Sequence, residues 1–256
     1  MKIVVLFSAG RHPASGAPCP VPVELQALRL ARDLAGADEV IGLHAGPVDG
    51  APLDALGHGL GRLIHLRMAQ GDDPLPALAQ VLEELAPDLI LAGRIGQGGE
   101  DGGLLPYALA RRLGRPILAD AASLGAGDDG TLTVEQALPR GARRRVVLRL
   151  PALLTVHPAA APALPFTFAA ARRGTVERRD IAPAPAAASE MEERAYRPRP
   201  KLIARAAPGA SAAERLKAAT QAASSGGRLL VDPAPEEAAR EILAHLRGIG
   251  VLRRRG

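Results

Sequence analysis

The segment from Gly93 to Gly103, GRIGQGGEDGG, is the part of this 256-residue chain whose composition most clearly suggests ligand chemistry. It follows the apolar run PDLILA and precedes LLPYALARRLG, whose apolar residues recur at helical spacing. A glycine-rich loop between a strand and a helix often holds phosphate, because free backbone N–H groups converge there. Arg94 offers a positive charge, whereas Glu100 and Asp101 repel phosphate unless they face ribose or adenine.

This loop does not match the common phosphate signatures. A G-x-G-x-x-G fingerprint that begins at Gly96 and Gly98 would need glycine where Asp101 stands, and a P-loop would need G-K-[ST]. Taken alone, the loop fits a simple glycine turn and a phosphate cradle equally well. Four glycines within six residues, at the carboxyl end of a predicted strand, favour the cradle.

No recognisable catalytic pattern accompanies the loop. The six histidines show no H-x-x-x-H spacing, and no G-x-S-x-G elbow supplies a nucleophile. We interpret the histidines as packing or surface residues. The adjacent pairs Glu83–Glu84 and Glu236–Glu237 are interpreted as solvated helix surface, because neighbouring helical residues do not share a face.

Composition excludes several classes of protein. Cys19 is the only cysteine, which excludes a disulfide framework and fits a reducing, cytoplasmic compartment. The net charge of +5 comes mostly from arginine, while aromatic residues make up 2%, so we expect no nucleic-acid partner. No apolar run approaches the roughly 20 residues that span a bilayer, so we expect no membrane insertion.

The elements that would position the loop alternate between strands and helices. Short apolar runs typical of strands buried on both faces are KIVVLFS, EVIGLHA, RLIHLRM and DLILAG. Helical spacing appears between them in VELQALRLARDLAG, PLDALGHGL and DPLPALAQVLEELAP, with Asp73 as a cap and Pro87 as a stop. A further helix covers about Leu104 to Leu113. This alternation predicts a parallel sheet with right-handed crossovers.

The second half of the chain does not continue the alternation of strands and helices. TLTVEQAL and RRRVVLRLPALLTVHP are predicted strands separated by the turn-like PRGAR, which indicates a hairpin that continues into the sheet. The stretch APAPAAASEMEERAYRPRPK is too rich in Pro and Ala to pack alone and is interpreted as an extended arm. The chain closes with helical SAAERLKAATQAA, strand-like RLLVD and the helix PEEAAREILAHLRGIG.

Several of these stretches together resemble one family, the beta subunits of electron-transfer flavoproteins. The strand, loop and helix PDLILAGRIGQGGEDGGLLPYALARRLGRP look like that family's nucleotide loop, and VELQALRLARDL is similar to its first helix, which begins with a Glu matched by Glu24. LPALLTVHP, ALPFTFAAARRGTVE and the tail GGRLLVDPAPEEAAREILAHLRGIGVL resemble later segments of the family. The similarity keeps the family's order and spacing from about Lys2 to Leu252.

This resemblance implies a fold and a role. The fold is an α/β parallel-sheet, Rossmann-like domain of the adenine nucleotide alpha hydrolase-like type over residues 1–182, followed over 183–256 by an arm with a terminal strand and helix. The role is that of an electron carrier rather than an enzyme, in a heterodimer whose alpha subunit holds most of the FAD site. Electrons pass from a donor dehydrogenase toward the respiratory chain through a quinone oxidoreductase. The beta subunit typically holds a structural AMP, or a second FAD in members that bifurcate electrons.

The resemblance also assigns residues by position. The nucleotide contacts fall in three loops that follow predicted strands: Phe7, Ser8, Ala45, Gly46, Gly93, Arg94, Gln97, Gly98, Gly99, Glu100, Asp101, Gly102 and Gly103. Partner contacts fall in a recognition loop at about 160–175: Leu164, which matches the family's anchor leucine, and Pro165, Phe166, Arg172 and Arg173. The alternative is that Leu164, Phe166 and Phe168 simply pack onto the domain.

Two departures from the family pattern bear on the ligands. The usual D-x-D-x-x-Q-x-G loop becomes GGEDGGLLP, which leaves open whether AMP, a second FAD or no nucleotide occupies it. PVP at Pro20 to Pro22 replaces the family's N-P-F, which removes an aromatic contact near the flavin. A free-standing ATP/AMP-binding module of the universal-stress-protein type is the alternative function. Pro106 stands where that class needs glycine, and the long arm also argues against it.

Overall fold

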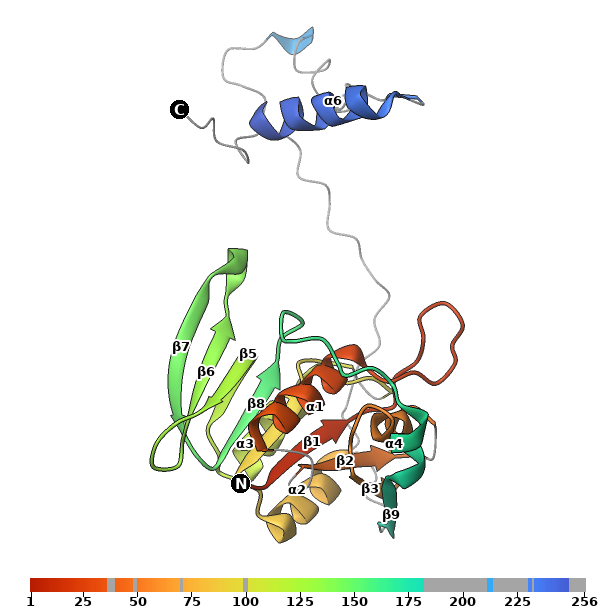
Figure 1. The fold of residues 1–256 in the computed structure, drawn as a ribbon, viewed down its shortest axis with the longest axis vertical. Coiled ribbons are helices and arrows are strands. Elements are labelled where there is room, and N and C mark those ends of the chain that lie inside the picture. The colour runs from red at the N-terminus through yellow and green to blue at the C-terminus, as the bar shows by residue number, and fades with distance from the viewer. Residues whose placement is uncertain are drawn as a thin grey trace. The chain divides into compact units, whose positions relative to one another are not determined.

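A computed structural model describes residues 1–35, 40–47, 50–69, 71–98, 101–181, 211–213, 230–231 and 233–248. The chain divides into two compact units, Met1–Met191 and Glu192–Gly256, and each is described by itself. The first unit contains a nine-stranded sheet in the order β7-β6-β5-β8-β4-β1-β2-β3-β9 (Figure 1). The predicted division after residue 182 stays a prediction.

The strands of the sheet are β1 (Ile3–Phe7), β2 (Val40–Gly46), β3 (Arg62–Arg67), β4 (Leu89–Gly93), β5 (Ile117–Ala126), β6 (Thr131–Ala137), β7 (Arg143–Arg149), β8 (Ala152–Val156) and β9 (Thr175–Asp180). The α-helices are α1 (Pro22–Ala35), α2 (Pro74–Leu85), α3 (Leu105–Arg112), α4 (Phe168–Arg173) and α6 (Pro235–Gly248), and η1 (Pro52–Leu56) and η2 (Pro139–Gly141) are short 3₁₀ helices.

The sheet is parallel except at one edge. In the spatial order β5-β8-β4-β1-β2-β3-β9, every neighbouring pair runs parallel. β6 and β7 form an antiparallel hairpin beside β5, as the sequence predicts. The chain passes from β1 to β2 and β3 on one side, and then returns to β4 on the other side of β1. The gap between the carboxyl ends of β1 and β4 is therefore a topological switch point, where open α/β sheets bind their ligands.

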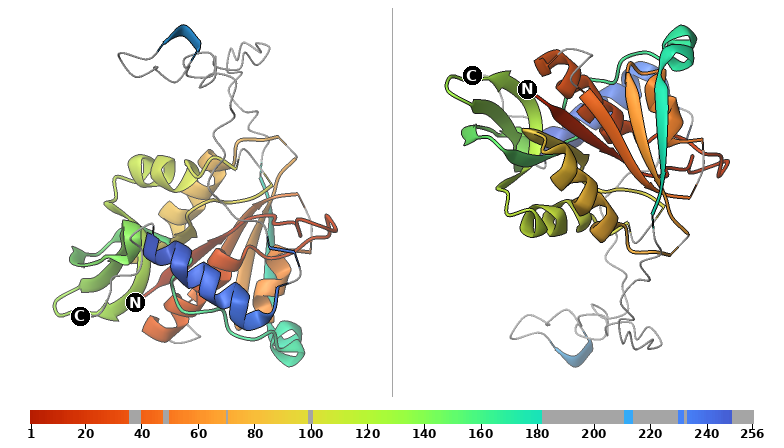
Figure 2. Two further views of the ribbon diagram at one scale, coloured as in Figure 1. Left: turned by 90° about the horizontal axis from the view of Figure 1, so that it is seen from above. Right: turned by 90° about the horizontal axis from the view of Figure 1, so that it is seen from below.

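Both faces of the central strands are covered, so the α/β fold predicted from the sequence is confirmed. All five residues of β1 are buried, and alternate residues join different cores. Ile3 and Val5 pack in the core that contains α1, whereas Val4 and Leu6 pack in the core that contains α2 and α3. Figure 2 shows α1 on one face of the sheet and α2 and α3 on the other.

The start and end of α2 agree with the prediction from the sequence, whereas the helix predicted around η1 is shorter than expected. The Asp73 side chain accepts a hydrogen bond from the Leu75 N–H at 2.9 Å, and the helix ends before Pro87 with Ala86 in the left-handed conformation. The segment PLDALGHGL, predicted as a helix, contains only the 3₁₀ helix η1. Gly57 follows η1 directly, and residues 57–59 form a turn that does not extend it.

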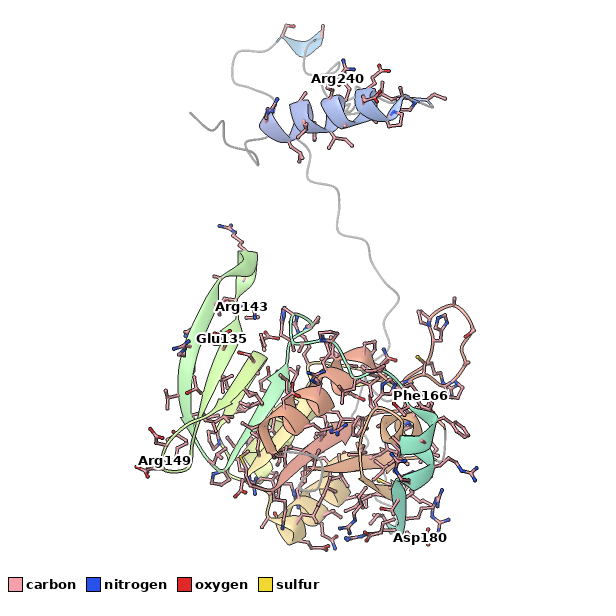
Figure 3. All side chains as sticks on the ribbon, in the orientation of Figure 1. Glu135, Arg143, Arg149, Phe166, Asp180 and Arg240 are labelled. Carbon is pink, nitrogen blue, oxygen red and sulfur yellow. The ribbon has the colours of Figure 1, made fainter. Side chains whose placement is uncertain are left out.

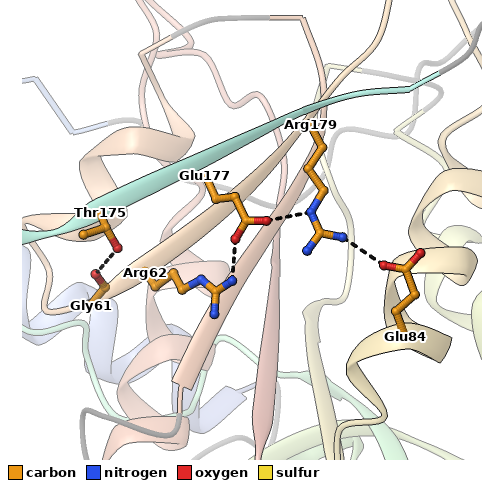
Figure 4. A network of polar contacts seen from close by, with 6 residues as sticks. All are labelled: Gly61, Arg62, Glu84, Thr175, Glu177 and Arg179. Atoms are coloured by element: carbon orange, nitrogen blue, oxygen red, sulfur yellow. Dashed lines mark hydrogen bonds and ion pairs between the residues drawn. The ribbon is translucent and has the colours of Figure 1, made fainter.

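Three elements were not predicted, namely β5, α4 and β9. β5 is built largely from small residues and is interrupted near Asp120, where its pairing with β8 shifts register. β9 is an edge strand of mostly polar residues, so it lacks the apolar signal of a buried strand. Polar side chains join it to its neighbours, since Glu177 binds Arg62 of β3 and Arg179, and Arg179 also binds Glu84 of α2 at 2.9 Å (Figure 4).

The second unit is described only in part. The predicted closing helix is confirmed as α6, which carries Arg240 (Figure 3). Of the predicted helix at 211–223 only residues 211–213 are described, and of the predicted strand RLLVD only Leu230 and Val231. The predicted arm APAPAAASEMEERAYRPRPK, residues 182–201, lies outside the described residues. Within the described part of the chain, no helix has the length and apolarity needed to span a membrane.

Candidate functional site

The loops after β1 and β4 meet at the switch point. The Gln97 backbone N–H donates to Ser8 Oγ at 2.9 Å, and the Gln97 side-chain oxygen accepts from the Arg11 backbone N–H at 3.1 Å. These two hydrogen bonds cross from one loop to the other in both directions. The structure thus brings Ser8 and the glycine-rich loop together, although they are 89 residues apart in sequence.

Glycines allow these backbones to approach closely. Gly98 has φ +84°, and a Cβ there would lie 2.9 Å from the Cβ and the carbonyl oxygen of Ala9. Gly103 has φ +66°, and a Cβ there would lie 2.7 Å from the carbonyl oxygen of Arg94. A side chain at either position would require the loop to shift. The glycines therefore serve the compact shape of the loop as well as any approach to a ligand.

A buried carboxylate lies directly beneath the two loops. Glu24, in the first turn of α1, is 3% exposed and accepts two hydrogen bonds from Ser8. The Ser8 N–H donates to Oε2 at 2.9 Å, and the Ser8 hydroxyl donates to Oε1 at 2.6 Å. Gly93 leaves room for this side chain, since a Cβ there would lie 3.1 Å from Glu24 Cγ.

The environment of Glu24 makes it easier to protonate than an ordinary carboxylate. Burial raises its pKa to about 7 by disfavouring the charged form, and the two hydrogen bonds from Ser8 lower it by a smaller amount. The sequence alone identified Glu24 only as a match to the family's first helix. Its partnership with Ser8, 16 residues earlier, depends on how α1 packs against the end of β1, and no local pattern signals it.

The positive charge of the loop is shared with a carboxylate. Arg94 Nε lies 3.2 Å from Asp120 Oδ1, although that oxygen accepts no aligned hydrogen bond. Asp120 has φ 60°, and its backbone N–H donates to Thr155 Oγ1 at 3.1 Å. The sequence does not reveal Asp120 as a site residue, because the strand β5 that carries it was not predicted. Its charge weakens the attraction that Arg94 exerts on an anion.

The ends of β1, β2 and β3 are held by two buried histidines. His44 Nδ1 donates to the Phe7 carbonyl oxygen at 3.0 Å, and His65 Nε2 donates to the Gly46 carbonyl oxygen at 3.0 Å. The two rings lie 5.0 Å apart. This arrangement places Phe7, Ala45 and Gly46 at the same edge of the sheet as Ser8. Both histidines thus have the packing role that the sequence suggests.

The assigned nucleotide residues therefore gather at one edge. Phe7, Ser8, Ala45, Gly46 and the described part of the loop line the carboxyl ends of β1, β2 and β4, while Gly99 and Glu100 lie outside the described residues. A backbone cradle of glycines fits the close approach of an adenine nucleotide. Among the described residues, no group of three or more His, Cys, Asp or Glu side chains is placed to hold a metal ion.

The helix that follows the loop contributes little to anion binding. α3 begins with Leu104 as a cap that makes no side-chain hydrogen bond, and Pro106 in its first turn carries no N–H group. A phosphate at this edge would therefore find its donors in the loops that follow the strands rather than at the start of α3.

The assigned partner residues form a second cluster, built on η1. The Leu164 carbonyl oxygen accepts from His58 Nδ1 at 2.6 Å, and the Phe166 ring lies over Gly57 and meets the His58 ring edge-on at 5.5 Å. Phe166 remains 49% exposed (Figure 3), and Phe168, at the start of α4, is 70% exposed. Leu164 is half-buried, Pro165 is exposed, and Arg172 and Arg173 are exposed in the last turn of α4.

Comparisons with known proteins agree with this architecture. The family model of the electron transfer flavoprotein domain matches residues 19–184, which include the loop after β4 and the cluster on η1. A protein of Chromohalobacter salexigens, named electron transfer flavoprotein subunit beta, is 40% identical over 267 residues, covering 99% of this chain and 96% of that protein. On this evidence the chain belongs to the family of electron transfer flavoprotein beta subunits.

Proposed function

We propose that this chain is the beta subunit of a heterodimeric electron transfer flavoprotein. In this role it pairs with an alpha subunit that holds most of the FAD, and it carries no bond chemistry of its own. The observation that carries the proposal is 40% identity over almost the full length of a protein named as such a beta subunit. The cytoplasmic location expected from the sequence stays a prediction.

The proposed electron route begins at a flavoprotein dehydrogenase and leads toward the respiratory chain through a quinone oxidoreductase. FAD supplies the electron-transfer chemistry when it is bound. The contribution of this chain is to complete the flavin site and to recognise partners. The exposed phenylalanine and arginine side chains of the cluster on η1 support a recognition role, because an apolar centre with a basic rim suits an acidic partner surface.

A structural AMP at the switch point is the nucleotide that we propose for this subunit. Support comes from the crossing of the β1 and β4 loops and from the glycines that let their backbones approach. A second FAD would occupy the same edge in a bifurcating member. The position of Pro106 argues against the free-standing stress-protein alternative, since it lies in the first turn of α3 where that class needs glycine.

The test is co-expression of the full chain with its alpha subunit. We expect a yellow heterodimer with a flavin absorbance spectrum and, after denaturation, release of FAD and AMP in equal amounts. Chromatography of the released nucleotides separates AMP from a second FAD or ATP. A colourless chain that does not co-purify with the alpha subunit would refute the proposed function, whereas a yellow heterodimer that releases only FAD would refute the AMP assignment alone.

A further inference from the structure

The one hydrogen of the Ser8 hydroxyl is engaged while Glu24 is ionised. It donates to Glu24 Oε1 at 2.6 Å and accepts from the Gln97 backbone N–H at 2.9 Å, and the Ser8 backbone N–H occupies Oε2 at 2.9 Å. A hydroxyl has one hydrogen to donate and two lone pairs to accept with. In this state Ser8 has no hydrogen left for a ligand.

Protonation of Glu24 reverses one of these bonds. A proton on Oε1 is donated to Ser8 Oγ, which lies 2.6 Å from it. Both lone pairs of Oγ are then filled, one by Glu24 and one by Gln97. The Ser8 hydroxyl hydrogen must turn to another acceptor, while the backbone bond to Oε2 is kept.

We propose that an adenine nucleotide binding at the switch point is coupled to uptake of a proton by Glu24, which converts Ser8 from a donor to Glu24 into a donor to the nucleotide. This inference rests on the proposed function for the presence of the nucleotide. Ser8 is only half-buried, so its hydroxyl can be reached from the edge of the sheet where the loops meet. An oxygen of phosphate or ribose supplies the acceptor that the released hydrogen requires.

Electrostatics favours the same coupling. An ionised carboxylate beneath the loop repels a phosphate, and the neutral acid does not. The pKa of Glu24, raised by burial to about 7, allows both protonation states near neutral pH. Arg94 does not remove the repulsion, because Asp120 lies 3.2 Å from it.

The causes that shift the pKa of Glu24 are its burial and its two hydrogen bonds with Ser8, and no other charged group is among them. Other titratable or charged groups on α1, on the strands packed against it and in the loops at the ends of those strands are Arg11, Arg29, Arg32, Asp33, His44, Arg94, Asp120 and His157. Arg29 pairs with Asp33, the Arg11 guanidinium donates to the Gly16 carbonyl oxygen, and His157 Nδ1 accepts from the Ala159 N–H. Burial and the Ser8 hydrogen bonds thus set the pKa of Glu24.

Calorimetric titration with AMP tests the coupling. The full chain, stripped of nucleotide and studied both alone and with its alpha subunit, is titrated in two buffers of different ionisation enthalpy between about pH 6 and 9. The difference in heat between the buffers gives the number of protons taken up. We expect proton uptake around pH 7 to 8. Above the pKa that Glu24 has in the nucleotide-free protein, the AMP affinity should fall by up to about tenfold per pH unit.

Glu24→Gln is the decisive variant. Its amide oxygen can accept from the Ser8 N–H and its amide nitrogen can donate to Oγ, so it imitates the protonated acid. We expect it to bind AMP at pH 8 at least as tightly as the wild type and to lose the extra proton uptake. Protons taken up or released by AMP itself are the same for every variant and therefore cancel in the comparison. Glu83→Gln, an equivalent change on the exposed face of α2, should behave as the wild type.

Three outcomes would overturn the proposal. Equal proton uptake in the wild type and Glu24→Gln would show that a group other than Glu24 takes up the proton. If the full chain does not bind AMP, there is no nucleotide binding to which the proton uptake could be coupled. If Glu24→Gln fails to fold, Ser8→Ala takes its place, since without the hydroxyl we expect weaker AMP binding and reduced proton uptake. Unchanged uptake in Ser8→Ala would refute the switch. Failure to pair with the alpha subunit refutes the proposed function separately.

Discussion

Glu24 shows how a single buried carboxylate can organise two loops that are far apart in sequence. It lies in the first turn of α1, where the helix dipole favours a negative charge, and its two oxygens receive both donors of Ser8. Burial opposes these effects and prevails, because the pKa is raised to about 7. The residue is therefore held at the boundary between its two protonation states, and pH acts on stability through it.

The pH dependence of stability should carry the signature of Glu24. Because its folded pKa of about 7 lies above its ordinary value of 4.5, the folded state binds the proton more tightly. The stabilisation is fully present below about pH 4.5 and is lost as the pH rises through 7, by up to roughly 3 kcal/mol. Urea unfolding of the wild type and Glu24→Gln between about pH 5 and 8 measures it.

In that experiment the free energy of unfolding of Glu24→Gln should vary less with pH than that of the wild type. Glu83→Gln is the control, because it removes a carboxylate on exposed helix surface and should keep the wild-type slope. Parallel pH slopes for the wild type and Glu24→Gln would contradict the prediction.

Gly103 and Gly114 form a matched pair that separates crowding from backbone strain. Their φ angles are +66° and +62°, but a Cβ at 103 would lie 2.7 Å from the Arg94 carbonyl oxygen, whereas a Cβ at 114 meets nothing within 4 Å. Gly114→Ala should cost about 1 kcal/mol from the left-handed backbone alone. Gly103→Ala should cost about 1 to 2 kcal/mol more and should lower nucleotide content. Urea unfolding that gives equal losses would show that the loop adjusts freely.

Among the elements of the fold, β9 depends on polar contacts along its edge. Glu177 accepts from both Arg62 and Arg179, which lowers its pKa through those hydrogen bonds, and the Thr175 hydroxyl faces the Gly61 carbonyl oxygen (Figure 4). Glu177→Gln should reduce the free energy of unfolding by less than about 1 kcal/mol, since the groups are partly exposed. The loss should shrink at high salt.

Salt-dependent urea unfolding measures this effect. Arg178→Gln provides the control, because it changes a charge on the same strand at an exposed position of the other face. A loss in Glu177→Gln that does not depend on salt would mean that packing, rather than charge, holds β9.

The elements also show why the sequence predicts some parts of this fold and not others. β1 and β4 are apolar along their length because both faces are buried, so composition reveals them. β9 is polar because it is an edge, and β5 breaks its pattern at Asp120, so neither gives a clear local signal. At the site, the glycine-rich loop can be recognised from its amino-acid composition. The hydrogen bond from the Gln97 N–H to Ser8 Oγ cannot, because it depends on the order of the strands in the sheet.

In the heterodimer that we propose, the cluster on η1 is the surface that we expect a donor dehydrogenase to meet. The Leu164 carbonyl oxygen is held by His58 at 2.6 Å, so Leu164→Ala removes the side chain while the backbone stays fastened. Because an apolar anchor seated in a partner's pocket is typically worth more than 1 kcal/mol, we expect kcat/KM for electron acceptance to fall about tenfold. Flavin content should not change, because in the proposed heterodimer most of the FAD site belongs to the alpha subunit.

Bleaching of the flavin absorbance by the reduced cognate dehydrogenase measures this rate. Phe168→Ala should show a loss of similar direction, because Phe168 is the most exposed of the apolar side chains described in the cluster. Val147→Ala is the matched control, since Val147 is 66% exposed on β7, an element of the opposite sheet edge. If all three variants accept electrons at the wild-type rate, Leu164 and Phe168 only pack on the domain, and recognition must lie on another surface.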